Sequence, residues 1–142
     1  MINYPISFFA VAESKSGIQS QWTVESQKIG TQCAIPPEFE GPGGALSPED
    51  LFAQALTNCF IATFKVYAEK SKLNFNYLSV ETELVADIGE EKKPVMKKCV
   101  LHVEIIGSEN VTRTKLLAEK AFQSGFILNS VKTEMLLNLK VS

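Results

Sequence analysis

The sequence has little of what most catalytic sites use, with one histidine, His102, and one arginine, Arg113, in 142 residues. A cluster of imidazoles around a metal is impossible, and a serine or cysteine nucleophile has a single histidine to serve as its base. His102 stands beside Val100 and Glu104 on the polar side of an expected strand, so we expect a solvated surface histidine. Hydrolase and metalloenzyme classes are disfavoured, and neither a metal nor a cofactor is expected.

The chain also lacks an excess of positive charge and a long apolar run. Its net charge is −2, and Arg113 alone offers a guanidinium, so nucleic acid is not an expected partner. Residues 51–64 form the longest apolar stretch, shorter than the roughly 20 residues that span a bilayer. The first residues carry no basic segment typical of a secretory signal. We therefore expect neither a membrane span nor a signal peptide.

Cysteine is scarce too. Cys33, Cys59 and Cys99 are odd in number and widely spaced, which fits neither a disulfide framework nor a zinc site built on paired thiolates. A reducing, cytoplasmic location is expected.

What is present suits one globular α+β domain. Apolar residues make up 45% of the chain and charged residues 21%. Gly and Pro breaks separate three expected strands at 6–12, 18–25 and 28–35, which we interpret as an antiparallel meander. A glycine-rich loop at 40–44 then leads to Ser47, a predicted N-cap of a helix that runs to about Lys72. Apolar residues occupy nearly every face of that helix, so we expect it to be buried on most sides.

The second half predicts a long hairpin of residues 78–88 and 95–106, a second helix from about 110 to 124 with Gly125 as its stop, and a last strand at 133–141. Val95, Cys99, Leu101 and other alternate residues of the hairpin are expected on one core face, interrupted by Lys97. The inward face of the second helix is expected to hold Leu116, Leu117, Ala121 and Phe122. The predicted fold class is α+β, with antiparallel sheets, a long buried central helix and a shorter second helix.

Two features could carry chemistry. The glycine loop precedes a helix N-terminus, which attracts anions, but it has no P-loop lysine and no dinucleotide fingerprint, and Glu49 and Asp50 occupy the positive end of the helix. We interpret it as a connecting loop. Cys59 lies in the middle of the helix, where a cysteine is either a small core side chain or a nucleophile.

The order of motifs along the chain helps to decide between these two roles of Cys59. The segment Gly43-Gly-Ala-Leu-Ser-Pro-Glu-Asp-Leu-Phe-Ala-Gln-Ala-Leu-Thr-Asn-Cys59-Phe60 resembles the central helix of the OsmC/Ohr superfamily, the osmotically inducible and organic hydroperoxide resistance proteins. In those proteins a glycine loop precedes Asn-Pro-Glu, and a cysteine follows ten residues after the glutamate. Glu49 and Cys59 have that spacing, and the order of strands and helices also matches, so the resemblance covers residues 1–142 as a single OsmC-like domain.

The resemblance implies a thiol peroxidase of organic hydroperoxides, in which a cysteine thiolate attacks the peroxide and becomes a sulfenic acid. Cys59 would be the nucleophile and Glu49 the carboxylate that orients a cation. The family's arginine belongs to an early turn, which here reads Glu13-Ser-Lys15-Ser-Gly17, so Lys15 is the substitute. An ammonium is a point charge without the arginine fork, and lower efficiency is expected.

The family's second, resolving cysteine is also missing. Matching residues 118–131 to the family's second helix places Gly125 at that cysteine. Cys33 and Cys99 stay open as replacements, although each falls in an expected strand.

Helix geometry adds one expectation of its own. On an unbroken helix the backbones of Glu49 and Cys59 would be roughly 15 Å apart, so a shared site needs the glutamate of a second chain. Together with the family's intertwined dimers, this predicts a homodimer.

The sequence leaves open whether the protein is an enzyme. One hypothesis is a weak or one-cysteine peroxidase that acts in oxidative stress and uses Cys59 with an external thiol reductant. Another is a non-catalytic OsmC-like module that binds a small hydrophobic ligand at the dimer interface. A third keeps Cys59 as packing alone.

Overall fold

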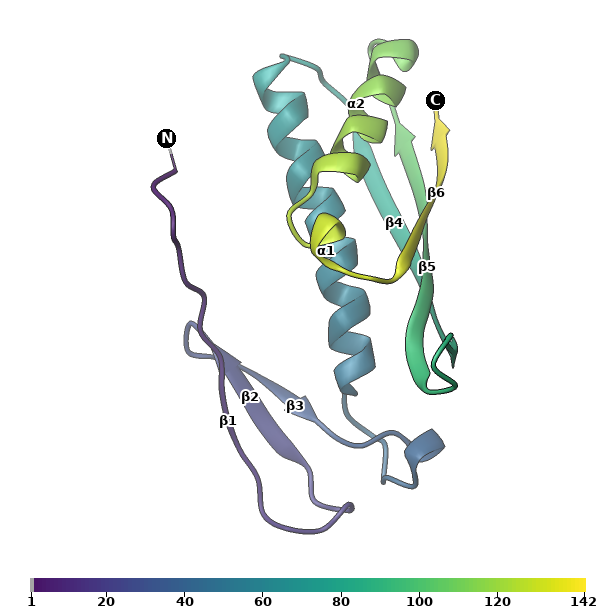
Figure 1. The fold of residues 1–142 in the computed structure, drawn as a ribbon. Helices are drawn as coiled ribbons and strands as arrows, with labels where there is room; N and C mark the ends of the chain where they lie inside the picture. The colour runs from purple at the N-terminus through teal and green to yellow at the C-terminus, as the bar shows by residue number, and fades with distance from the viewer. Residues whose placement is uncertain (1) are drawn as a thin grey trace. The chain divides into compact units, whose positions relative to one another are not determined.

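The computed structural model describes residues 2–142, and the chain divides into two compact units, one ending at Leu51 and the other comprising Phe52–Ser142. The first unit contains an antiparallel meander of β1 (Val11–Glu13), β2 (Trp22–Ser26) and β3 (Ile29–Cys33), as the sequence predicts (Figure 1). Gln27 and Lys28 both have positive φ, which suits a tight two-residue hairpin turn.

The strand at 6–12 was expected to be longer than β1 is. Val11 pairs with Glu25, and the partner strand ends one residue later, at Ser26. Residues before Val11 therefore have almost no length of β2 opposite them with which to pair. The expected start of the second strand at residue 18 is also wrong. The Ser20 amide donates to the Gly17 carbonyl in a turn, and β2 begins only at Trp22.

The glycine-rich loop is held to the meander by side-chain amides. Gln19 Nε2 donates to the Glu40 carbonyl oxygen at 3.1 Å, and Gln21 Nε2 donates to that of Gly43 at 3.0 Å. Gly43 has a φ of +63°, a conformation that glycine adopts without strain. These hydrogen bonds hold the loop in place before the helix, which fits its interpretation as a connecting loop.

Ser47 caps the first helix as predicted. Its Oγ accepts from the Asp50 amide at 3.0 Å, and Asp50 Oδ2 accepts from the Ser47 amide at 2.9 Å. This reciprocal pair is a capping box, and it fixes the start of α1 (Pro48–Lys70).

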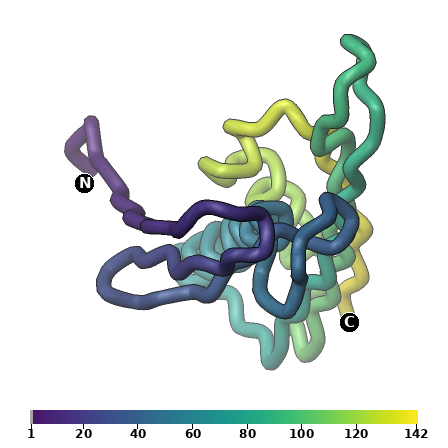
Figure 2. The backbone as a smooth tube through the Cα atoms, turned by 90° about the horizontal axis from the view of Figure 1, so that it is seen from below, coloured from purple at the N-terminus to yellow at the C-terminus, as the bar shows by residue number. Residues whose placement is uncertain are grey.

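The second unit consists of most of α1, β4 (Tyr77–Ile88), β5 (Pro94–Ile106), α2 (Val111–Ser124) and β6 (Glu134–Val141), with a short 3-10 turn, η2 (Leu128–Ser130). The sheet order is β4–β5–β6, and α1 and α2 lie side by side on one face of the sheet (Figures 1 and 2). Asn110 caps α2 by accepting from the Arg113 amide, and Gly125 ends it as predicted.

The α+β class is confirmed, but the sheets are not wholly antiparallel. β6 pairs parallel to β5, with Leu101 opposite Leu137. A parallel pair needs a crossover connection, and α2 is that connection, passing over the face that α1 also covers. The expectation of antiparallel sheets is therefore wrong for this strand.

The core of the second unit lies between the sheet and the two helices. Phe60 and Phe64 of α1 are fully buried and stack with ring centroids 6.0 Å apart. From the sheet side, alternate residues of β5 are fully or almost fully buried: Cys99, Leu101, Val103 and Ile105.

Several residues expected in the core lie outside it, including Ile88 at the end of β4, which is 52% exposed. Leu116 is 63% exposed, because the buried face of α2 is formed by Thr114, Ala118 and Ala121, and Leu116 is about 200° around the helix from Thr114. Val95 is exposed because Lys98 pairs with Val85 whereas Met96 pairs with Ala86. Lys97 is the extra residue of a β-bulge, and on its Val95 side the alternation of buried and exposed side chains along β5 is reversed.

The expectation for His102 is confirmed. Its ring is exposed on the outer face of β5, and the side-chain amide of Asn138 on β6 lies 3.1 Å from Nδ1. Within residues 2–142, no helix is long and apolar enough to cross a membrane.

We predict that Leu56→Asp destabilises the protein strongly. Leu56 is fully buried in α1, and a carboxylate there would have no partner, which should lower the free energy of unfolding by about 3 kcal/mol or more. Urea unfolding measures the change. Leu116→Asp is the matched control, and equal midpoints for the two variants would contradict the placement of α1 in the core.

Candidate functional site

The side chain of Cys59 lies against the end of α2. A Cβ built on Gly125 would stand 2.8 Å from Cys59 Sγ, 3.1 Å from Leu128 Cδ1 and 3.4 Å from Thr63 Oγ1. The sulfur therefore contacts the backbone of Gly125 directly. Cys59 itself is 9% exposed, so only a small part of it is open to a reactant.

Backbone hydrogen bonds hold the glycine in this contact. It directly follows α2, on which Ala118 and Ala121 are fully buried. The Gly125 amide donates to the Ala121 carbonyl at 3.1 Å, and the Asn129 amide donates to the Gly125 carbonyl at 2.9 Å. The glycine is thus held from both sides, and it leaves the space that Cys59 Sγ occupies.

Gly125 is the residue that sequence matching placed at the family's second cysteine. The direct contact between Gly125 and Cys59 agrees with that matching, because two cysteines at these positions would be neighbours. Cys59 occupies the position that the resemblance assigns to the nucleophile, and the glycine at the neighbouring position has no side chain.

The other two cysteines occupy different surroundings. Cys33, at the end of β3 in the first unit, is buried, and its thiol donates to the Thr31 carbonyl at 3.6 Å. Cys99 is fully buried in the middle of β5, and burial raises the pKa of its thiol. Since a resolving cysteine attacks as a thiolate, the raised pKa argues against Cys99 in that role. All three cysteines are free thiols.

The single arginine has a structural partner. The Arg113 guanidinium donates to the Ser71 carbonyl, just beyond the last turn of α1. Twelve residues of helical rise, about 18 Å, separate that level from Cys59. Arg113 therefore cannot take the place of the family's arginine within the chain.

Lys15 and Glu49 belong to the first unit, whereas Cys59 belongs to the second. Lys15 is exposed in the turn after β1, where a hollow of about 530 Å³ is lined by Glu13, Ser14, Lys15, Ser20 and Gln21. The ion pair that joins Lys140 and Glu104 is the only one within residues 2–142, so the Lys15 ammonium is unpaired. That Lys15 lies near Cys59 stays a prediction.

Glu49 is the second residue of α1, where Asp50 rather than Glu49 makes the capping bonds. Its Oε1 atom is buried and has no hydrogen-bond partner among the residues that the structure describes. A buried carboxylate oxygen without a donor is costly, which marks Glu49 as an acceptor suited to a further donor. Because α1 is continuous from Pro48 to Lys70, Glu49 and Cys59 of one chain are roughly 15 Å apart along its axis.

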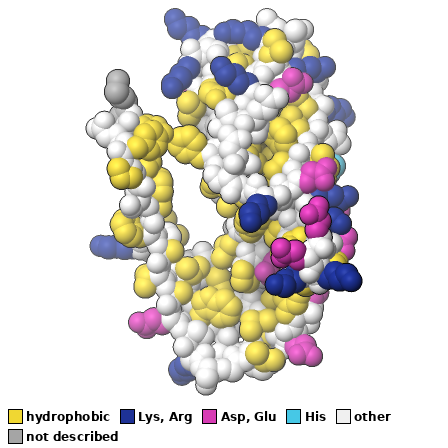
Figure 3. All heavy atoms as spheres, viewed as in Figure 1, with side chains coloured by type: hydrophobic (Ala, Val, Ile, Leu, Met, Phe, Trp, Pro, Cys, Tyr) yellow, Lys and Arg dark blue, Asp and Glu magenta, His cyan; other side chains and the backbone are white. Residues whose placement is uncertain are grey.

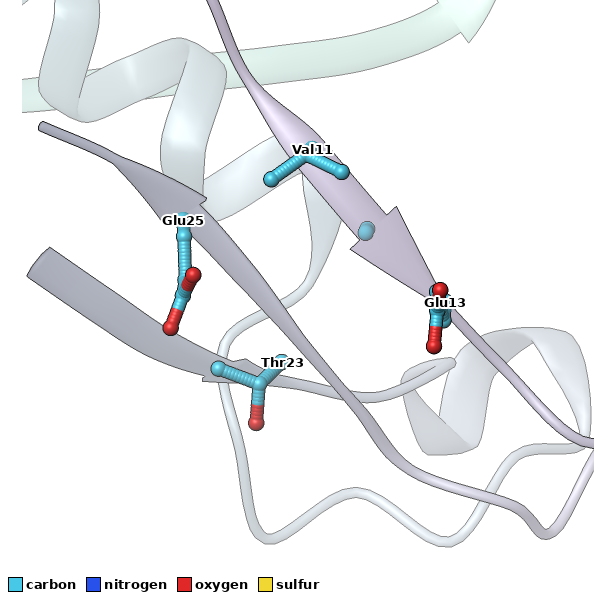
Figure 4. A pocket seen from close by; sticks show the side chains of 5 residues that line it. Val11, Glu13, Thr23 and Glu25 are labelled. Carbon is cyan, nitrogen blue, oxygen red and sulfur yellow. The ribbon is translucent and has the colours of Figure 1, made fainter. Parts of the chain in front are cut away.

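A separate hollow of about 410 Å³ lies on one face of the meander (Figure 4). Val11 and Glu13 of β1 and Thr23 and Glu25 of β2 line it, with Ala12. Two carboxylates but no thiol line it, so it offers no chemistry of the kind that Cys59 could perform.

Sequence reasoning did not single out Thr63, Tyr67 or Ser124 as site residues. Tyr67 Oη lies 2.5 Å from Ser124 Oγ, one residue before Gly125. The available signal was the spacing of Cys59, Thr63 and Tyr67 at four-residue intervals, which places all three on one helix face. The partner on α2 could not be identified from that spacing.

Known proteins resemble the whole chain. An uncharacterized protein of Bacillus subtilis, YmaD, is 27% identical over 124 residues, which cover 84% of this chain and 83% of that protein. The structure of an OsmC-like protein of unknown function from Vibrio cholerae superposes with a TM-score of 0.85 at 19% identity, covering 95% of this chain and 99% of that one.

A third comparison concerns a protein described as an organic hydroperoxide resistance protein OsmC from Legionella pneumophila. Its structure has a TM-score of 0.74 and 25% identity, covering 97% of this chain and 99% of that one. The model of the OsmC-like protein family matches residues 41–140, which include α1, α2 and the second sheet except for the last residue of β6. The chain belongs to the OsmC-like protein family.

Proposed function

We propose that this protein is a thiol peroxidase that reduces organic hydroperoxides through Cys59 in a one-cysteine cycle. The observation that carries the proposal is the contact between Cys59 Sγ and Gly125 in an OsmC-like chain. Cys59 stands where the resemblance implies the nucleophile, and the position beside it has no thiol. The similarity to the Legionella hydroperoxide resistance protein supports the substrate class.

The cycle has three balanced steps. The Cys59 thiolate attacks the distal peroxide oxygen, the O–O bond breaks, and the alkoxide leaves as an alcohol after taking a proton, so that Cys59 becomes a sulfenic acid. An external thiol then forms a mixed disulfide with Cys59 and releases water. A second external thiol displaces Cys59 and restores its thiolate. The cycle consumes two thiols per peroxide and needs a reducing environment such as the cytoplasm.

In this proposal Lys15 stabilises the thiolate, and Glu49 orients the Lys15 ammonium. Two observations within residues 2–142 support these roles: Lys15 has no ion-pair partner there, and Glu49 Oε1 is buried without a donor. Because Glu49 and Cys59 of one helix are too far apart, the proposed site takes Glu49 from a second chain. The protein is therefore proposed to be a homodimer, in which residues 1–142 of each chain form one OsmC-like domain.

Exposed apolar side chains of the first unit support dimer formation. The segment before β1 exposes large apolar residues along its length (Figure 3): Ile2 53%, Tyr4 64%, Ile6 47%, Phe8 85% and Phe9 82%. A contiguous apolar surface of this kind is typical of a protein interface. Light scattering at micromolar concentration should give the mass of two chains, and a monomer would remove the argument for a shared site.

We predict that one equivalent of tert-butyl hydroperoxide adds about 16 Da to Cys59 and forms no internal disulfide. The reason is that the position next to Cys59 has no thiol. Peptide mass spectrometry after trapping of the sulfenic acid identifies the modified residue, with Cys59→Ser as the control.

Two other results would contradict the one-cysteine cycle. A bridge from Cys59 to Cys33 or Cys99 would show that a resolving cysteine exists. An unmodified Cys59 would instead favour a module that binds a small hydrophobic ligand without chemistry.

We predict that Lys15→Ala slows peroxide consumption by about fivefold to tenfold, because one partly screened charge near the sulfur is worth roughly 1 kcal/mol. Lys15→Arg should retain or raise the rate, since it restores the fork that the family uses. Stopped-flow measurement of peroxide loss gives both rates. Lys28→Ala removes another exposed lysine of the first unit and is the control; an unchanged rate in Lys15→Ala would exclude Lys15 from the site.

We further predict that Gly125→Cys forms a disulfide with Cys59 on mild oxidation. A Cβ at Gly125 would lie 2.8 Å from Cys59 Sγ, close to the about 3 Å between a Cβ and the far sulfur in a disulfide. Loss of two hydrogen masses in the linked peptides measures the bond. Gly125→Ser, which adds a similar side chain without sulfur, is the control, and two free thiols after oxidation would contradict the contact.

A further inference from the structure

Cys59, Thr63 and Tyr67 face the last turn of α2 from one side of α1. At the far end of this row, Tyr67 Oη lies 2.5 Å from Ser124 Oγ. Lys120, one turn earlier on α2, places its ammonium 5.2 Å from the centre of the Tyr67 ring. The tyrosine is thus fixed by two contacts, a hydrogen bond at its hydroxyl and a cation at its ring face.

The direction of the hydrogen bond follows from the single proton of the serine. Ser124 Oγ donates to the Lys120 carbonyl oxygen at 2.7 Å. Its lone pairs remain as acceptors, and so the Tyr67 hydroxyl donates to Ser124. Tyr67, Ser124 and the Lys120 carbonyl therefore form a short chain that ties the end of α2 to α1. We call the Tyr67 to Ser124 bond the Tyr67–Ser124 clamp.

The clamp acts on the residue next to Ser124. Gly125 follows it directly and contacts Cys59 Sγ. Beyond Gly125 the chain leaves the helix, with Phe126 63% exposed and Ile127 41% exposed. The clamp is therefore the side-chain bond that holds the end of α2 to α1 next to the covered sulfur.

We propose that Tyr67 and Ser124 are positioning residues that keep Gly125 against Cys59 and so limit access to its sulfur. This inference rests on the proposed function, because covering the sulfur protects a sulfenic acid only if Cys59 forms one. Without a resolving cysteine, the sulfenic acid waits for an external thiol and is exposed to a second peroxide. That reaction converts Cys–SOH and ROOH into Cys–SO₂H and ROH, which is irreversible for most proteins. A sulfur covered by Gly125 has little room for the second oxygen.

The clamp is tested by the rate at which iodoacetamide alkylates each cysteine, resolved by peptide mass spectrometry. Tyr67→Phe removes the hydroxyl and keeps the ring under Lys120. It should raise the Cys59 rate about fivefold, the factor by which one net hydrogen bond shifts a local equilibrium. Ser124→Ala should have the same effect, whereas Ser124→Thr keeps the acceptor and should stay near the unmodified protein.

The double variant separates the clamp from general loosening. Because both substitutions break one bond, Tyr67→Phe with Ser124→Ala should alkylate Cys59 no faster than either alone. The buried Cys33 and Cys99 are internal controls and should keep their rates. Tyr77→Phe, at a tyrosine that is 56% exposed, should change nothing.

Three results would each overturn the proposal. These are a Cys59 alkylation rate in the double variant that is the product of the two single effects, an unchanged Cys59 rate in the single variants, and an equal rise in the alkylation rate of Cys99. Excess tert-butyl hydroperoxide supplies the functional measurement, since Tyr67→Phe should increase the sulfinic fraction of Cys59 and Ser124→Thr should not. If the unmodified protein forms no sulfenic acid, the proposed function fails, while the alkylation series still decides whether the clamp covers Cys59.

Discussion

The packing of α1 against the second sheet and α2 is the constraint on which the rest of the structure depends. Phe60 and Phe64 direct one face of the helix into the core, and that orientation places the neighbouring Cys59 against the end of α2. If the helix were rotated about its axis, a core phenylalanine would leave the core and Cys59 would no longer face the end of α2. The chemistry proposed for Cys59 and the stability of the second unit therefore rest on the same packing.

Local signals allowed much of this fold to be predicted from the sequence. The Ser47 cap, the Gly125 stop and the hairpin turn are each specified by a few adjacent residues, and each prediction was confirmed. The errors depend on distant partners. The parallel pairing of β6 follows from the crossover through α2, and the exposure of Val95 follows from a bulge at Lys97 that only the pairing with β4 defines.

The candidate site shows the same division. The spacing between Glu49 and Cys59 predicted the family from the sequence, and the family model confirms it. The role of Cys59 as nucleophile stays a prediction. The contact of Cys59 with Gly125 and the bond between Tyr67 and Ser124 join residues more than fifty positions apart, so no local pattern encodes them. Arg113, the one arginine of the sequence, binds the Ser71 carbonyl beyond the end of α1.

Cys59 is proposed to reduce organic hydroperoxides repeatedly while an external thiol is oxidised. This proposal is tested by steady-state consumption of tert-butyl hydroperoxide in excess dithiothreitol, with the uncatalysed reaction subtracted. We expect many turnovers per chain for the unmodified protein and for Cys33→Ser with Cys99→Ser, and none for Cys59→Ser. Equal consumption by Cys59→Ser, or no consumption by the unmodified protein, would contradict it.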